Sequence, residues 1–90
     1  MSAKPTPPTV VPVSNDLRGT LAFRVRTLRV AKGWSQERLA LECELDRTYV
    51  SAVERSRWNI SLANIDRLAR ALEVAPWTLL QPVSVKGEPV

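Results

Sequence analysis

The sequence predicts an all-α fold with one folded domain, and three observations lead to that expectation. Apolar residues recur every three or four positions along almost the whole chain, which is the spacing of an amphipathic helix. No segment alternates with the period of two that a half-buried strand requires. Ninety residues provide one modest hydrophobic core and leave no room for a separate ligand-sensing domain. We therefore expect five helices between residues 17 and 82.

The two ends of the chain lack this helical pattern. Residues 1–16 hold four prolines among Ser, Thr and Val, and no apolar run there is long enough for a signal or membrane segment. This composition predicts a disordered tail without a function of its own. A minor-groove arm is the alternative, but Lys4 and Arg18 are the only cations near it. Residues 83–90 have little to bury and are expected to form a C-terminal tail.

The first helix is predicted at residues 17–31. Leu21, Val25 and Leu28 share one of its faces, while its arginines lie on the others. Gly33 ends this helix, because glycine tolerates the left-handed conformation that follows a helix end.

Two short helices follow, and each has a residue that suits its first position. The Ser35 hydroxyl can accept hydrogen bonds from the first turn of the second helix, whose inward residues include Cys43. After a short connection, Asp46 can cap the third helix, which runs to about Arg55. The third helix turns the apolar pair Val50 and Val53 toward the core.

The last two helices are marked by another cap and by prolines. Ser61 caps a fourth helix, in which apolar residues repeat at i, i+3, i+4 and i+7, namely Ile65, Leu68, Ala69 and Leu72. Pro76 favours the start of a final short helix, and Pro82 ends it. Trp77, Leu79 and Leu80 lie close together there and predict a two-fold dimer interface.

Basic residues are concentrated between residues 17 and 57. That stretch holds nine basic and five acidic residues, and the excess of four equals the net charge of the whole chain. A polyanion would bind there, although arginine-rich helices are often only solvated. The basic residues are Arg18, Arg24, Arg26, Arg29, Lys32, Arg38, Arg47, Arg55 and Arg57, and the acidic ones are Glu37, Glu42, Glu44, Asp46 and Glu54.

The outward face of the third helix suits close approach to a nucleic acid. At about 100° per residue, the positions opposite the core are Thr48, Ser51, Ala52 and Arg55. Small residues let a helix approach base edges, and arginine can bond guanine through two hydrogen bonds. Glu54 projects toward the core side, where an unpaired carboxylate is costly, so we expect an arginine partner for it.

The strings Trp34-Ser35-Gln36-Glu37-Arg38-Leu39-Ala40 and Leu45-Asp46-Arg47-Thr48-Tyr49-Val50-Ser51-Ala52-Val53-Glu54-Arg55 resemble the phage-repressor-like (Cro and repressor) helix-turn-helix family. The resemblance covers about residues 21–80 and implies a λ-repressor-like domain. The sequence departs from this family at Glu44, where glycine is frequent because the turn requires a positive φ. The run from Leu45 through Asn59-Ile60-Ser61 to Leu72-Glu73-Val74 is most similar to the controller proteins of bacterial restriction-modification systems.

The resemblance implies a role for each candidate site residue. Base-reading positions would be Arg47, Thr48, Ser51 and Ala52. DNA-backbone positions would be Ser35, Gln36, Arg55, Arg57, Asn59 and Ser61. Arg29 would be the ion-pair partner of Glu54. Trp58 lies in a polar loop; the sequence does not decide its burial, and a DNA contact from it is not expected.

The implied function is that of a cytoplasmic, nucleoid-associated transcription regulator, which binds a palindromic operator as a homodimer and controls its own restriction-modification operon. An antitoxin-like module that masks a partner protein through its C-terminal turn is the alternative. The chain has one cysteine, no histidine and no glycine-rich phosphate loop, which argues against an enzyme or a metal site. We expect no cofactor, small-molecule ligand or membrane partner.

Overall fold

Four α-helices and one short 3₁₀ helix make up the described part of the chain. The computed structural model describes residues 5–8, 11–12 and 16–83. The helices are α1 (Leu17–Ala31), α2 (Gln36–Cys43), α3 (Arg47–Glu54) and α4 (Leu62–Leu72), followed by the 3₁₀ helix η1 (Pro76–Leu80). The all-α prediction is confirmed, and the fifth predicted helix is the 3₁₀ turn η1. None of the helices in these ranges is long and apolar enough to cross a membrane.

Side-chain caps fix where the helices begin. The expected caps Ser35, Asp46 and Ser61 accept backbone N–H bonds of 3.0, 2.7 and 3.1 Å at the starts of α2, α3 and α4. Asp16 does the same for α1 by accepting from the Gly19 N–H at 2.9 Å. Asp16 therefore belongs to the folded domain, although the predicted boundary placed it in the N-terminal tail.

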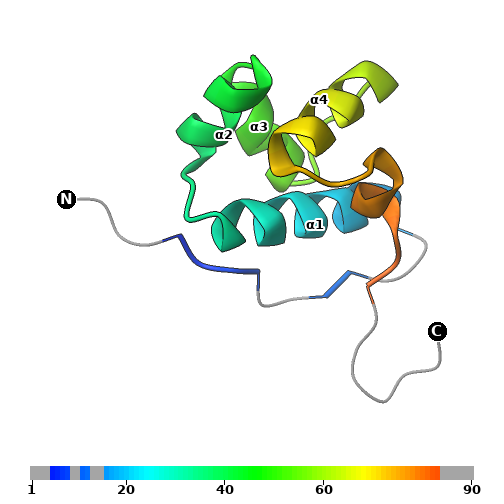
Figure 1. The fold of residues 1–90 in the computed structure, drawn as a ribbon. Coiled ribbons are helices and arrows are strands. Elements are labelled where there is room, and N and C mark those ends of the chain that lie inside the picture. The colour runs from blue at the N-terminus through cyan, green and yellow to red at the C-terminus, as the bar shows by residue number, and fades with distance from the viewer. Residues whose placement is uncertain (1–4, 9–10, 13–15, 84–90) are drawn as a thin grey trace.

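The core lies between α1, α2, α3, α4 and η1, each of which contributes buried side chains. Its fully buried side chains include Val25 of α1, Leu39 of α2 and Leu68 of α4. Cys43 is also buried in this core, as predicted, and burial raises the pKa of its thiol above the ordinary value. In Figure 1, α1 lies across one side of the group formed by α2, α3 and α4, and η1 packs at the same side.

The structure corrects the predicted dimer interface at one position. Leu79 is 0 % exposed, because η1 packs on both α1 and α4 and turns this side chain into the core of its own protomer. A fully buried side chain is not available to a second copy. Trp77 is 69 % exposed and Leu80 is partly buried, so these two remain candidates for that surface.

Two arginines of α1 bind segments from opposite ends of the chain. Arg24 donates to the carbonyl oxygens of Gln81 and Pro82 at 3.1 and 2.8 Å. Arg26 donates to the carbonyl and hydroxyl oxygens of Thr6, both at 3.1 Å. The predicted N-terminal tail thus touches the domain at Thr6. Residues 1–4, 9–10 and 13–15 of that tail, and residues 84–90 of the predicted C-terminal tail, lie outside the described residues.

Candidate nucleic-acid interface

A three-residue connection joins α2 to α3. Glu44 adopts φ 58° and ψ 40°, the left-handed conformation that the family resemblance implied at this position. The Leu45 N–H then bonds back to the Ala40 carbonyl at 2.9 Å, which closes the end of α2. Asp46 follows in an extended conformation and starts α3. This geometry is that of a helix-turn-helix.

A buried ion pair fixes α3 against α1. Arg29 Nε and Nη2 donate to the two carboxylate oxygens of Glu54 at 2.7 and 2.9 Å, so the pair is bidentate. The two side chains are only 7 % and 3 % exposed. The expected Arg29–Glu54 pair is therefore confirmed, and charge-assisted bonds of this kind hold both position and orientation.

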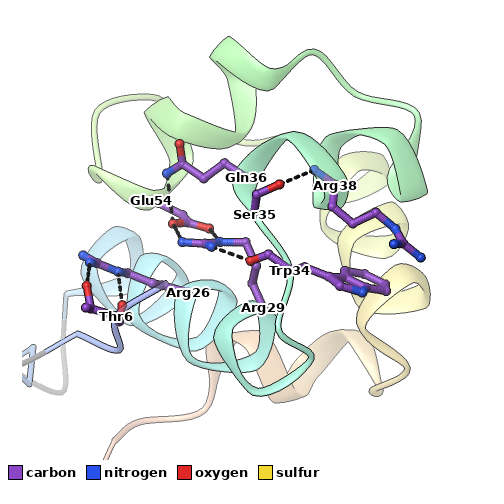
Figure 2. A network of polar contacts seen from close by, with 8 residues as sticks. All are labelled: Thr6, Arg26, Arg29, Trp34, Ser35, Gln36, Arg38 and Glu54. Atoms are coloured by element: carbon purple, nitrogen blue, oxygen red, sulfur yellow. Dashed lines mark hydrogen bonds and ion pairs between the residues drawn. The ribbon is translucent and has the colours of Figure 1, made fainter. Parts of the chain in front are cut away.

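The same network reaches the beginning of α2 (Figure 2). Arg29 Nη1 donates to the Trp34 carbonyl at 2.8 Å, and Gln36 Nε2 donates to Glu54 Oε1 at 3.1 Å. An amide nitrogen carries two hydrogens, so Gln36 keeps one N–H for a further acceptor. Helices α1, α2 and α3 are thereby joined at one point, which sets the angle at which α3 is presented.

The exposed face of α3 holds most of the predicted base-reading residues. Arg47 and Thr48 are exposed at the N-terminal end of the helix, and Ser51 is partly exposed one turn later. The prediction for Ala52 is wrong, because this residue is only 2 % exposed. Helix α3 packs against both α1 and α2, and the chain folds back beside it when the Arg57 N–H bonds to the Ala52 carbonyl at 3.0 Å.

The loop after α3 brings polar side chains next to that face. Ser56 adopts φ 59°, which turns the chain sharply after the helix. The predicted backbone-contacting residues are exposed around this turn and at the start of α4, namely Arg55, Arg57, Asn59 and Ser61. On the other side of α3, the exposed Ser35 and the partly buried Gln36 begin α2.

The arginines divide into two groups according to their partners. Six of them donate to protein oxygens, namely Arg24, Arg26, Arg29, Arg38, Arg67 and Arg70. Within residues 5–8, 11–12 and 16–83, no side-chain hydrogen bond or ion pair is found for Arg18, Arg47, Arg55 or Arg57. Three of these four lie on α3 or the loop that follows it. Their positive charge is available to an external anion.

Comparisons with known proteins decide the family. The model of the family described as "Helix-turn-helix" matches residues 25–76. The chain belongs to the helix-turn-helix family.

Within this helix-turn-helix family, the relatives include restriction-modification controllers. Control protein C.BamHI of Bacillus amyloliquefaciens is 45 % identical over 69 residues, which cover 76 % of this chain and 85 % of the relative. The solved structure of the hypothetical transcription factor NHTF from Neisseria is 59 % identical with a TM-score of 0.86, and the match covers 88 % and 91 % of the two chains. The controller C.Esp1396I, solved as a tetramer with its natural 35 base-pair operator, is 33 % identical with a TM-score of 0.65, over 70 % and 83 %. The resemblance to phage-repressor-like and controller proteins is confirmed.

The helix-turn-helix contains two features that the sequence did not assign to the site. The Ser56 hydroxyl donates to the Arg18 carbonyl at 3.4 Å, which places the start of α1 beside the loop after α3. This contact joins residues far apart in the chain, so no local pattern could have predicted it. Tyr49 of α3 and Trp58 of the loop also meet in an edge-to-face pair, with ring centroids 5.8 Å apart.

Proposed function

We propose that this helix-turn-helix protein is a transcription regulator that binds a palindromic operator in duplex DNA as a homodimer. Support comes above all from the arginines that flank the exposed face of α3 and have no protein partner among the described residues. The Arg29–Glu54 pair holds α3 against α1, so the exposed face of α3 can enter a major groove as part of a rigid unit. Arg47, Thr48 and Ser51 are the base-reading residues of this proposal.

The DNA backbone would be contacted on both sides of α3. The start of α2 offers backbone N–H groups, and Gln36 offers its second amide hydrogen, to one phosphate. On the other side, the backbone would be contacted by Arg55, Arg57, Asn59 and Ser61. Arg18 joins this group, because the hydrogen bond from the Ser56 hydroxyl to its carbonyl places the start of α1 beside the loop after α3. These contacts set the register of the helix but carry no sequence information.

Dimerisation through η1 would place two copies of α3 on one face of the duplex. Trp77 and Leu80 supply the apolar surface, and the half-sites should lie roughly 34 Å apart, about one helical turn of DNA. Relatives of this chain include controllers, one of which was crystallised as an operator-bound tetramer. We therefore propose autoregulation of a restriction-modification operon in the bacterial cytoplasm, where the protein joins the nucleoid when bound. Its own concentration would be the signal, and catalysis is no part of this role.

The decisive experiment is a fluorescence-anisotropy titration with the duplex found immediately upstream of the gene. A scrambled duplex of equal length serves as the control, and both are measured at two salt concentrations. Tight, salt-sensitive binding to the upstream duplex alone supports the proposal. Equal weak binding to both duplexes refutes it and favours a protein partner instead.

The dimer has a separate test in sedimentation equilibrium. Trp77→Glu places a charge on the exposed apolar surface of η1 and should convert dimers to monomers without unfolding the domain, since Trp77 contributes little to the core. A dimer that persists in this variant would mean that a different surface joins the two copies.

A further inference from the structure

Trp58 is a large apolar side chain on an otherwise cationic surface. It is 48 % exposed, while most other large apolar residues of the loop and of α3 face the core. Its neighbours Arg57 and Asn59 are both exposed. Water is an unfavourable environment for an indole ring, because apolar surface that stays exposed does not gain the free energy that burial contributes.

The ring of Trp58 is also held in place. Tyr49, on the partly buried edge of α3, packs against it with an interplanar angle of 66° and a centroid distance of 5.8 Å. Edge-to-face geometry of this kind is favourable for two aromatic rings. The Arg57 N–H, bonded to the Ala52 carbonyl, fixes the backbone immediately before Trp58. A loop residue is thus attached to the helix that would read the bases.

We propose that Trp58 is a DNA-contacting residue, which packs its ring against a deoxyribose and donates its indole N–H to the adjacent phosphate. This inference rests on the proposed function. The charge of the surroundings favours nucleic acid over a protein partner, because Arg55 and Arg57, which precede Trp58 in the same exposed segment, have no anionic partner in the described residues. Deoxyribose is the apolar part of the DNA backbone, and the indole nitrogen is a donor without acceptor capacity, as a phosphate requires.

The contact has a characteristic energetic signature. A neutral ring that binds a sugar adds affinity for every sequence and releases no counterion. Trp58→Ala should therefore weaken binding about tenfold, with unchanged base preferences and an unchanged salt slope. Arg57→Ala is the matched control, because the loss of one phosphate contact should lower the slope of log K against log salt by about 0.9.

The affinity test uses the wild-type protein and a duplex selected from a random library, with a panel of its single base-pair variants. The expected tenfold loss in Trp58→Ala should be uniform across the panel, and Trp58→Phe should retain part of the affinity because it keeps a ring on Tyr49. A loss below twofold, or a relaxed preference at one base pair, overturns the sugar contact. If the wild-type protein itself binds no duplex, the proposed function fails instead.

A spectroscopic test separates a direct contact from a merely structural role. The chain has three tryptophans, so Trp34→Phe/Trp77→Phe leaves Trp58 as the only indole. Phenylalanine keeps an apolar ring on the proposed dimer surface at Trp77, and sedimentation and a DNA titration compare this variant with wild type first. Saturating duplex should protect its fluorescence from acrylamide severalfold. Unchanged quenching would overturn the proposal and assign Trp58 a role in packing. A Trp58→Ala variant that becomes monomeric in sedimentation, with unaltered DNA affinity per protomer, would overturn it in favour of a role in dimerisation.

Discussion

Three arginines in the body of α1 and the arginines of α3 with its following loop carry the same charge in opposite surroundings, and Arg18, at the start of α1, belongs with the second group. On α1, Arg24, Arg26 and Arg29 all donate to protein oxygens. On α3 and the loop, the arginines have no such partner in the described part of the chain. The first group holds the domain together, and the second group is available to DNA. A count of basic residues in the sequence cannot separate the two, because the difference lies in what each guanidinium touches.

The strongest test of this comparison is Arg29→Met. The substitution leaves the Glu54 carboxylate buried without its cation, and removal of one partner from a buried pair costs about 3–5 kcal/mol. Urea unfolding should show this loss in the free energy of unfolding. The double variant Arg29→Met/Glu54→Met should recover most of it, since an apolar replacement of both partners is often neutral. A single variant within 1 kcal/mol of wild type would show that the pair is dispensable.

Arg47→Ala should have the opposite profile. Because Arg47 is exposed and has no protein partner in the described residues, its loss should change the free energy of unfolding by less than about 0.5 kcal/mol. Operator affinity should fall by about 1–3 kcal/mol, with relaxed preference at one base pair. Arg70→Ala is the matched control, because Arg70 is exposed but pairs with Asp66 on α4. A uniform loss over all sequences would make Arg47 a phosphate contact.

The helices were predictable because their signals are local. Ser35, Asp46 and Ser61 combine a cap with a following apolar pattern, and each indeed begins a helix. An arginine partner for Glu54 was also expected, because a carboxylate on the core side of a helix requires a cation, and the family resemblance identified that partner as Arg29.

The errors share a different cause. A helical wheel assumes one buried face, whereas α3 packs against both α1 and α2, and Ala52 is buried although the wheel placed it outside. The prediction of Leu79 as a dimer-interface residue was wrong for the same reason, since η1 packs against both α1 and α4. The Ser56–Arg18 and Arg26–Thr6 contacts depend on tertiary structure, which neither spacing nor composition encodes.

A smaller effect is expected at the turn that separates the two groups of arginines. Glu44 has φ 58°, a conformation that costs about 1 kcal/mol for most residues and little for glycine. Glu44→Gly should therefore raise the free energy of unfolding by up to about 1 kcal/mol, measured in urea, and leave DNA affinity unchanged. Glu44→Ala removes the charge but keeps the strain. Equal stabilisation by both variants would assign the effect to charge at the end of α2.

The smallest effect concerns a basic residue of a third kind, which is partly buried and pairs with an exposed carboxylate. Lys32 donates to Glu73 and thereby lowers the pKa of that carboxyl. Because the folded-state pKa lies below the unfolded value, the stabilisation is present above the ordinary pKa of glutamate and is lost as pH falls through the lowered value. Urea midpoints of wild type and Glu73→Gln should differ slightly at pH 7 and converge in acid. A gap that persists in acid would exclude the ion pair as its source.

The reactivity of the buried Cys43 can report how often the folded domain opens. It is the only cysteine of the chain, and the residue is 4 % exposed in the core. A thiol reagent can reach it only when the domain opens, so the rate of alkylation measures how often opening occurs. Any molecule that binds the closed form makes opening rarer in proportion to its occupancy. Operator DNA, unrelated DNA and a second copy of the chain can thus be ranked as ligands on the unlabelled wild-type protein.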